Sequence, residues 1–390
     1  MKILYDLSSV QPSPVCKFHG GGKYGESVFL ELIKYSSIVE IEAFYSQDLP
    51  LPIEVERVCK KQGIILYDIS SVKLEEILDR SKCDIVFLPL PYTLSKNIMV
   101  QSSCQWVGVF HGLRALELYT DSNMIWYHNS KLKGLMRYLL NLLNEKGRFA
   151  EIKRQYSEII GNPRFHCITA SNHSKFSIRS FFPNLSDCDV KVFYPPGNSS
   201  GEEFRSCQGL DSEEYFLMLS ANRWEKNVVR AVWAFDEVLS ENKNLHKKIV
   251  ITGITNNTGW QKKVKNRDAF IFLDYVDTDV LNWLHANAYA FVYPSLNEGF
   301  GLPLVESMKH GVPILASGAA SITEVCGDAA WFFDPRNVNE IKNRIYWSLD
   351  TSERELMTQR ARERFKFLDG KQRSDLNALI EYLIRHGKEG

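Results

Sequence analysis

"AYAFVYPSLNEGFGLPLVESMKHGVPILAS", residues 288–317, contains the elements of a strand–loop–helix–strand unit. Its two apolar runs, AFVYPS and VPILAS, are typical of buried strands. Pro303 suits the first turn of the helix between them, because proline lacks the N–H that would be unpaired there. Gly311 suits the end of the same helix. Two strands joined by a helix in this way run parallel, so the stretch predicts an α/β fold.

The same alternation of short apolar runs and helix-period segments extends along the whole chain. Strands are predicted at 2–7, 38–45, 84–90, 106–111, 215–220, 247–253, 269–276 and 288–295, and helices at 24–36, 71–81, 225–240, 279–287 and 373–387. Residues 192–214 are rich in Pro, Gly, Ser and charge, which favours a linker. We therefore predict two doubly wound, Rossmann-like domains that face each other across a ligand cleft, at 1–195 and 196–370. A C-terminal helix, 371–390, is expected to pack back toward the first domain.

Length and charge limit the classes of function. A chain of 390 residues is long enough for two domains with separate cores. Lys plus Arg and Asp plus Glu both number 47, so no overall field would attract nucleic acid, and none is expected as a partner. The eight cysteines include no C-x-x-C pair, and the N-terminus lacks the apolar region of a signal peptide. We therefore expect a cytoplasmic protein with reduced thiols.

HGGGKYG, residues 19–25, places Gly20 and Gly22 in the G-x-G-x-x-G spacing of a dinucleotide-binding fingerprint. That fingerprint begins directly after a strand, whereas residues 8–19 intervene here, so a nicotinamide site is disfavoured. Two interpretations remain open. The glycines form either a loop whose amides approach a phosphate before a helix that begins at Tyr24, or a flexible turn.

Three further residues follow predicted strands, where ligands meet the edge of a parallel sheet. His111 ends the strand at 106–111, and this position favours a functional role at a ligand site, although a lone histidine is more often structural. Arg223 and Lys226 follow the first strand of the second domain, and two cations there would suit a diphosphate. The alternative is that Glu225 and Lys226 are solvated residues of a first helical turn.

Two D-x-D sequences, at 187–189 and 277–279, resemble a metal clamp. The first lies in a polar loop, and the second is predicted to supply the N-cap and first turn of the helix at 279–287. We therefore predict no bound metal and no cofactor.

Glu298 and Glu306 flank the predicted N-terminus of the helix in the opening stretch. Gly299 and Gly301 leave room for a phosphate to approach backbone amides. Glu298 lies on the loop, near the reacting end of a bound nucleotide. Glu306 lies about one turn into the helix, where a carboxylate could accept the hydroxyls of a ribose. The helix dipole favours acids at a helix start, but it explains Glu306 poorly and Glu298 hardly at all.

Residues 297–335, from NEGFGLPLVESMKHG to AAWFFDP, resemble the E-x7-E signature region of family 4 retaining glycosyltransferases, which have the GT-B fold. GGGKYG and LSANRWEKN resemble the glycine loop and the Arg/Lys phosphate motif of that family, and the resemblance covers most of the chain. It implies that Glu306 binds the ribose, that Glu298 contacts the transferred sugar and that His111 hydrogen-bonds the donor sugar. The other implied donor contacts are Gly20 and Gly22 at the phosphate, Arg223 and Lys226 at the β-phosphate, the amides of Phe300, Gly301 and Leu302 at the sugar or diphosphate, and Tyr275 and Val276 at the base.

The sequence thus predicts a retaining hexosyltransferase that moves a sugar from a nucleoside diphosphate to a saccharide or lipid-linked acceptor. GDP or UDP is favoured as the carrier, and mannose is a candidate sugar. The resemblance implies bacterial surface polysaccharide biosynthesis: O-antigen, capsule or lipopolysaccharide. A nucleotide-sugar epimerase of the same fold and a nucleotide-binding protein without turnover are the alternatives. Residues 131–154 carry seven basic residues and leucines at helical spacing, which predicts a helix either on the inner membrane or packed against its own domain.

Overall fold

The computed structural model describes residues 1–12, 20–93, 96–185, 189–197, 203–212, 214–254 and 259–389. Contacts between residues divide the chain into two compact units. Unit 1 comprises Met1–Leu113, Glu151–Ser199 and Gly370–Gly390, and unit 2 comprises Arg114–Ala150 and Ser200–Asp369. Residues 114–150, which are predicted from the sequence to belong to the N-terminal domain, group with unit 2 by these contacts.

Unit 1 contains a parallel sheet of seven strands in the order β3-β2-β1-β4-β5-β6-β7. The strands are β1 (Lys2–Asp6), β2 (Glu40–Tyr45), β3 (Ile65–Asp68), β4 (Ile85–Leu88), β5 (Gln105–Phe110), β6 (Phe165–Thr169) and β7 (Val190–Val192). The four strands predicted in this part of the chain are confirmed as β1, β2, β4 and β5. Their continuous apolar runs are typical of strands that are covered on both faces.

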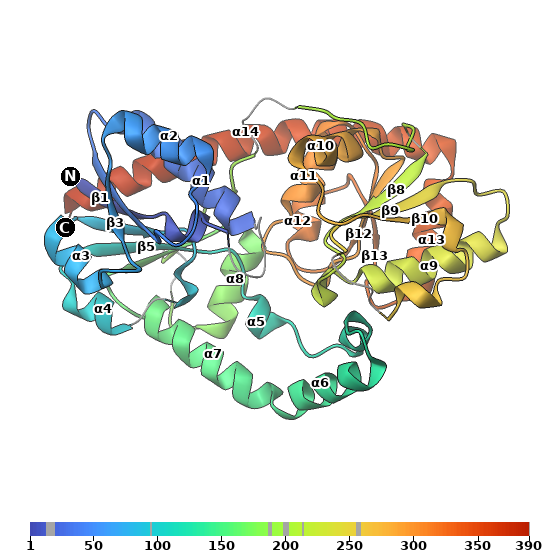
Figure 1. Cartoon of the computed structure of the whole chain (residues 1–390), viewed down its shortest axis with the longest axis horizontal. Coiled ribbons are helices and arrows are strands. Elements are labelled where there is room, and N and C mark those ends of the chain that lie inside the picture. Colours follow the sequence, from blue (N-terminus) through green and yellow to red (C-terminus); the bar gives the residue numbers. More distant parts are fainter. Residues whose placement is uncertain are drawn as a thin grey trace. The chain divides into compact units, whose positions relative to one another are not determined.

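Helices cover both faces of this sheet. They include α1 (Gly20–Leu32), α2 (Ile53–Gln62), α3 (Leu74–Ser81), α4 (Lys96–Gln101) and α8 (Asn172–Phe181). Figure 1 shows α1 and α2 on one face and α3 and α4 on the other. Helix α1 begins four residues before the predicted start at Tyr24, so the expected glycine loop is wrong for Gly20 and Gly22, which form the first turn of the helix.

Unit 2 contains a parallel sheet of six strands in the order β10-β9-β8-β11-β12-β13. The strands are β8 (Tyr215–Met218), β9 (Lys248–Ile251), β10 (Phe270–Phe272), β11 (Ala290–Tyr293), β12 (Ile314–Ser317) and β13 (Trp331–Phe333). The predicted strands in this part of the chain are confirmed, including both strands of the opening stretch. The strand order reverses between β8 and β11, which makes their carboxyl ends the topological switch point of the sheet.

Two layers of helices enclose this second sheet. α9 (Val228–Glu241) and α13 (Val338–Ser348) contribute to one core with the strands. Figure 1 shows α10 (Thr278–Asn287), α11 (Leu302–Lys309) and α12 (Ile322–Cys326) together on the other face. The helix predicted at 225–240 starts at Val228 instead, because the 3-10 turn η5 (Trp224–Lys226) and a left-handed Asn227 precede it.

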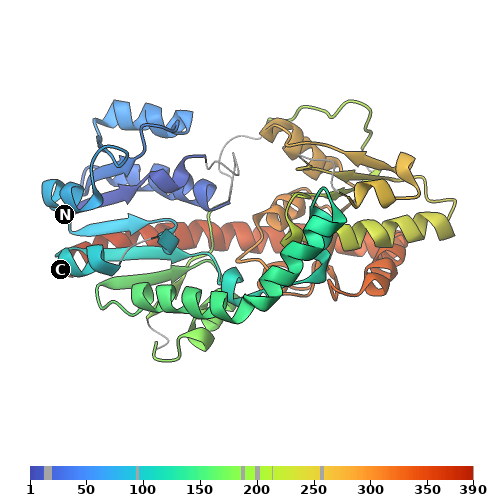
Figure 2. The same ribbon diagram turned by 60° about the horizontal axis from the view of Figure 1, so that its bottom comes forward.

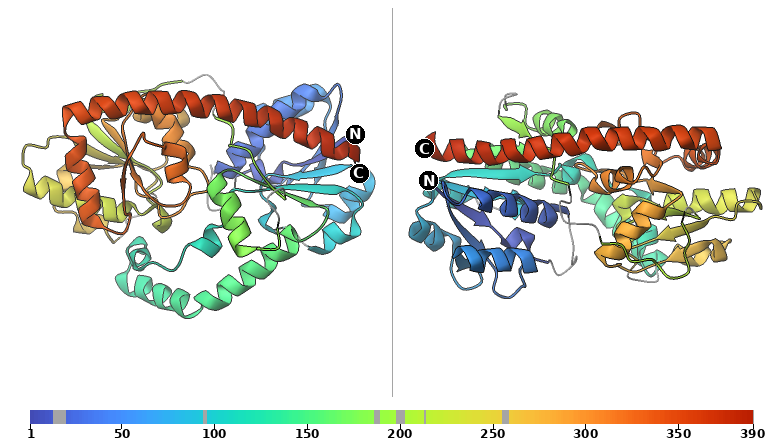
Figure 3. Two further views of the ribbon diagram at one scale, coloured as in Figure 1. Left: turned by 180° about the vertical axis from the view of Figure 1, so that it is seen from behind. Right: turned by 90° about the horizontal axis from the view of Figure 1, so that it is seen from above.

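The C-terminal helix is longer than predicted. The segment at 373–387 is the end of α14 (Thr351–Glu389), a helix of 39 residues that is continuous in both views of Figure 3. Leu379, Ile380 and Leu383 of α14 pack in the core of unit 1 together with Val28 and Phe29 of α1. The first half of α14 is rich in charged residues, so it lacks the strong apolar stripe by which a helix is recognised in a sequence.

The segment at 131–154 is not one helix. It contains α6 (Lys131–Leu143) and the first part of α7 (Glu145–Ile160), which meet at Asn144 and are visible as two separate rods in Figure 2. A four-residue helix, α5 (Arg114–Glu117), and a 3-10 helix, η4 (Ser122–Tyr127), precede them. Among the described residues, no helix combines the length and the apolar character that a membrane span requires.

Candidate functional site

The carboxyl ends of β8 and β11 bring together residues that are far apart in the sequence. Arg223 and Lys226 lie on the segment that follows β8, and Glu298 lies on the loop that follows β11. Because the two strands are neighbours in the sheet, these two loops leave the same edge side by side. The predicted cations and the predicted acid are therefore parts of one cluster in unit 2.

Lys226 and Glu298 form a buried ion pair. The Nζ atom of Lys226 donates to Oε1 of Glu298 at 2.5 Å, and the two residues are only 9% and 7% exposed. Ser295 Oγ donates to the same carboxylate oxygen at 2.6 Å, and Lys226 Nζ lies 3.2 Å from the hydroxyl of Tyr293. The alternative interpretation of Lys226 as a solvated first-turn residue is thus wrong.

The electrostatics of the pair favour the charged forms. Burial alone would raise the pKa of Glu298, but the nearby positive charges of Lys226 and Arg114 outweigh this effect and lower the pKa to about 2. Burial lowers the pKa of Lys226, and the attraction to Glu298 opposes that change. A proton on Glu298 would leave the ammonium without its counter-charge, so we interpret the pair as ionised at neutral pH.

A second acid, Glu225, links two arginines beside this pair. Its Oε1 accepts hydrogen bonds from Arg223 Nη2 at 2.7 Å and from Arg114 Nη1 at 3.0 Å. Both arginine side chains remain 39% exposed, whereas that of Glu225 is 14% exposed. With Lys226 and Glu298, the cluster holds three cations and two carboxylates, so it keeps one net positive charge. Such a cluster suits an anion with several oxygens.

Arg114 and the role of Glu225 were not found by sequence reasoning. Arg114 begins α5, directly after the segment of unit 1 that ends at Leu113, and it contacts a residue 111 positions later. No local motif marks it, because the contact depends on the docking of α5 against η5. The only signal in the sequence was its place shortly after His111 and the strand at 106–111.

The loop after β11 is held in shape up to the start of α11. Gly301 is the N-cap residue with φ of 107°, a conformation that disfavours a side chain, and an added Cβ would lie 2.9 Å from Cδ1 of Leu304. Ser321 Oγ donates to the carbonyl oxygens of Glu298 and Phe300 at 2.9 and 3.1 Å. The amides at Gly301 and Leu302 therefore lie at a fixed helix N-terminus, where an anion is favoured.

Glu306 lies one turn further along α11 and is half-buried. His285 of α10, which is 2% exposed, directs Nε2 toward Oε2 of Glu306 at 3.5 Å and places Nδ1 2.7 Å from Ser307 Oγ. Burial lowers the pKa of His285 to about 3, so the ring is neutral at physiological pH. We infer that Nε2 carries the proton, because Nδ1 then accepts from the serine hydroxyl. His285 is a second residue that sequence reasoning missed.

Tyr275 and Val276 follow β10 and precede α10. Tyr275 is exposed, and its hydroxyl accepts a hydrogen bond from Asn222 at 2.9 Å. The adjacent D-x-D at 277–279 is occupied by a cation of the chain itself: Arg205 pairs with Asp277 at 2.6 Å and with Asp279 at 2.7 Å. Asp187, in the other D-x-D, lies outside the described residues, and in the described part of the chain no group of His, Cys, Asp or Glu side chains is arranged to hold a metal.

The predicted site residues of unit 1 cluster around the end of β4 and β5. The ring of His111 lies edge-on to Tyr24 of α1, with centroids 4.8 Å apart, and its Nε2 donates to the carbonyl oxygen of Pro89 at 3.0 Å. Gly20 is exposed and Gly22 is buried in the first turn of α1. Their predicted contacts with a phosphate and a sugar stay predictions.

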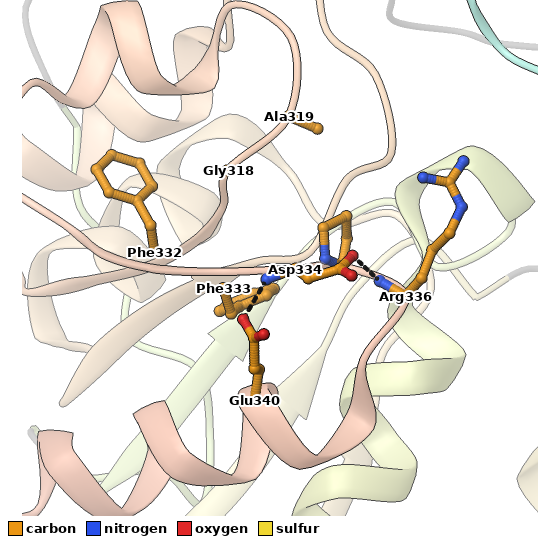
Figure 4. A pocket seen from close by; sticks show the side chains of 8 residues that line it. Gly318, Ala319, Phe332, Phe333, Asp334, Arg336 and Glu340 are labelled. Carbon is orange, nitrogen blue, oxygen red and sulfur yellow. Dashed lines mark hydrogen bonds between the residues drawn. The ribbon is translucent and has the colours of Figure 1, made fainter.

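Unit 2 also contains a hollow of about 470 Å³, lined by Gly318, Ala319, Phe332, Phe333, Asp334, Pro335, Arg336 and Glu340. Figure 4 shows that its acids are engaged with backbone: Glu340 accepts from the N–H of Asp334 at 2.8 Å, and Asp334 accepts from the N–H of Arg336 at 2.9 Å. These bonds stabilise the turn before α13. None of the predicted site residues lines the hollow, so the cluster at β8 and β11 remains the candidate site.

Apart from Arg114, the cluster and the glycine-capped helix lie within a segment that has known relatives. Residues 201–364 match the family model of glycosyl transferases group 1. An O-antigen chain mannosyltransferase of Escherichia coli is 36% identical over 155 residues, which span 37% of this chain and 40% of that protein. An O-antigen chain mannosyltransferase of Salmonella typhimurium is 31% identical over 174 residues, which span 44% of this chain and 47% of that protein. The matches thus span less than half the length of these curated relatives.

The fold is shared over the full chain. A sucrose-phosphate synthase structure from Thermosynechococcus elongatus superposes with a TM-score of 0.72 and covers 100% of both chains at 14% sequence identity. This likeness shows the fold alone. Together with the two parallel sheets, it confirms the predicted GT-B architecture of two Rossmann-like α/β domains.

Proposed function

We propose that this chain is a retaining glycosyltransferase of family 4 that moves a hexose from a nucleoside diphosphate to a saccharide or lipid-linked acceptor. The observation that carries the proposal is the buried Lys226–Glu298 pair beside the N-terminus of α11, at the switch point of the sheet in unit 2. The match of residues 201–364 to glycosyl transferases group 1 supports the same reaction class. Relatives named as O-antigen mannosyltransferases support surface polysaccharide biosynthesis and mannose as the sugar.

The donor would use the cluster as a binding site for its diphosphate. Lys226, Arg223 and the amides at the start of α11 would stabilise the negative charge that develops on the leaving phosphate. A phosphate oxygen would compete with Glu298 for the ammonium of Lys226, which would allow the carboxylate to accept from hydroxyls of the sugar. Glu306 would accept from the ribose hydroxyls, oriented by the N–H of His285.

The transfer step needs no metal in this scheme. The bond between the anomeric carbon and the phosphate oxygen breaks, and the acceptor oxygen bonds to the same carbon on the same face of the ring. The proton of the acceptor hydroxyl passes to an oxygen of the departing phosphate. Glu298 would stabilise positive charge on the sugar during this step, and His111 would hydrogen-bond the sugar as the family resemblance implies.

Residues 131–154 would bring such an enzyme to a lipid-linked acceptor by peripheral contact with the cytoplasmic face of the inner membrane. This part of the proposal rests on the basic residues and exposed leucines of the segment.

A panel of nucleoside diphosphates tests the proposed function. We expect one of GDP, UDP, ADP or CDP to raise the melting temperature of the protein, and to do so equally in the presence of EDTA. Incubation with the matching nucleoside diphosphate-hexose should then release the diphosphate only when an acceptor, such as a mannose oligosaccharide or a polyprenol-linked saccharide, is added. Failure of all four diphosphates to stabilise the protein would refute the donor site. Release of an epimerised sugar without acceptor would identify an epimerase instead.

A further inference from the structure

The apolar side of α6 points away from the rest of unit 2. Exposed apolar side chains on this helix are Leu132, Leu135, Met136, Leu139, Leu140, Leu142 and Leu143. Leu143 is 85% exposed and Leu132 is 68% exposed, values that are unusual for leucines of a folded protein. A contiguous exposed apolar face of this kind marks an interaction surface.

The opposite side of α6 explains this orientation. Gly134 is buried, and a Cβ added to it would lie 2.3 Å from the carbonyl oxygen of Ile125 in η4. Asn141 lies on the same side, seven positions later, and its Nδ2 donates to Sδ of Met124 at 3.7 Å. Small and polar residues therefore face the protein and pack closely on η4, while the leucines are turned outward.

The charged residues of α6 itself are all cations. Residues 131–143 contain Lys131, Lys133 and Arg137 and no Asp or Glu. Lys263 adds a cation close by, because its Nζ lies 4.3 Å from the ring centroid of Trp126, over which Lys131 also lies at 5.6 Å. An apolar face bordered by cations is complementary to a surface that is both apolar and anionic.

We propose that α6 docks on an anionic lipid surface, with its leucines at the boundary of headgroups and acyl chains and its cations on the lipid phosphates. A second copy of this chain is the less favourable occupant, because pairing two α6 helices would bring the three cations of one against those of the other. The proposal narrows the predicted contact at 131–154 to α6, since α7 buries its own apolar residues Tyr156, Ile159 and Ile160.

Docking through α6 would act on unit 2 directly. In η4, Asn123 Nδ2 donates to Asn227 Oδ1 at 3.0 Å, and Asp121 next to it pairs with Arg230 at 2.8 Å. Asn227 directly follows Lys226 of the candidate site. A docked α6 would therefore hold that site at the membrane surface. Its benefit for a lipid-linked acceptor rests on the proposed function, whereas the docking itself does not.

Flotation with vesicles tests the docking without any nucleotide or acceptor. The full chain should float with vesicles that contain phosphatidylglycerol and remain unbound with vesicles of phosphatidylcholine alone, and binding should weaken as salt is added. The double variant Leu139→Ser/Leu143→Ser should lower the vesicle affinity by about tenfold or more. Lys133→Glu/Arg137→Glu should lower it on anionic vesicles as well.

Ile53→Ser is the matched control, because Ile53 is 86% exposed on α2, a helix whose three cations are accompanied by Glu54 and Glu56. It should float like the unaltered protein. All variants replace exposed side chains, and unchanged melting temperatures will show that they fold. Absence of flotation with anionic vesicles, or equal flotation of the leucine variant, would overturn the proposal. A dimer in solution that dissociates on Leu139→Ser/Leu143→Ser would instead assign the surface to a second copy.

Discussion

Glu298→Gln removes one charge from the buried pair with Lys226 and preserves the shape of the side chain. We expect it to destabilise unit 2, because an ammonium that is 9% exposed would lose its counter-charge. Breaking a buried ion pair by removing one partner costs about 3–5 kcal/mol. The pKa of Glu298 gives a similar magnitude, since its fall from the ordinary value of 4.5 to about 2 corresponds to ~3 kcal/mol of stabilisation of the charged form.

Thermal unfolding can resolve this effect. For a unit of this size, 3–5 kcal/mol corresponds to a decrease in melting temperature of roughly 6–20 °C. Glu237→Gln is the matched control, because Glu237 pairs with Lys342 at 3.0 Å on the surface with its side chain 53% exposed. Removing that exposed pair should change the free energy of unfolding by about 1 kcal/mol or less.

The nucleoside diphosphate that stabilises the unaltered protein supplies the second part of the test. Its phosphate would provide Lys226 with the negative charge that Glu298→Gln removes, so the ligand should raise the melting temperature of the variant more than that of the unaltered protein. If the variant had the same melting temperature as the unaltered protein, the reasoning about the buried pair would be refuted. A destabilised variant with no response to the diphosphate would show that the ligand does not reach Lys226.

Three further outcomes are expected. The pKa of Glu298 is lower in the folded chain than its ordinary 4.5. The ionised carboxylate therefore stabilises the fold above about pH 4.5, and this stabilisation is lost as the pH falls toward 2. Urea titrations across this range should show the loss in the unaltered protein and not in Glu298→Gln. Glu306→Gln should weaken binding of the diphosphate by about 1.5–3 kcal/mol in calorimetric titrations. It should leave kcat nearly unchanged, because the ribose contact is the same in ground and transition states. A fall in kcat at unchanged affinity would contradict this role. Gly301→Ala should cost about 1–3 kcal/mol in thermal unfolding, because the new Cβ meets Leu304 at 2.9 Å with φ at 107°; an unchanged melting temperature would show that the loop relaxes.

Much of the fold could be predicted because its signals are local. Apolar runs bounded by turn residues identified β1, β2, β4 and β5 of unit 1 and β8 to β12 of unit 2, but they missed β3, β6, β7 and β13. Pro303 and Gly311 identified the start and end of α11 correctly. Local signals failed at the start of α1. Gly20 to Gly22 form its first turn, and a Cβ at Gly21 would lie 2.7 Å from the side chain of Leu90, a contact that no sequence period reveals.

The sequence predicted which types of residue form the candidate site, but not how these residues are arranged in space. The sequence by itself determined that cations follow β8 and that an acid follows β11. Residues that follow parallel strands lie at one edge of the sheet, so both groups were expected at that edge. Only the strand order, with β8 beside β11, decided that Lys226 and Glu298 pair with each other across 72 positions. Arg114 and His285 joined the site only through the packing of α5 and α10, so no local pattern marked them.

The same division holds for α6. The sequence determined an amphipathic helix with cations beside its leucines, a pattern that suits burial in a core as well as contact with a lipid surface. The tertiary structure decided between the two orientations. The close approach of Gly134 to the backbone of Ile125 leaves no room for a side chain at that position, so α6 packs on η4 through this side. The leucines lie on the opposite side and are exposed, although burial of apolar surface alone would favour the reverse.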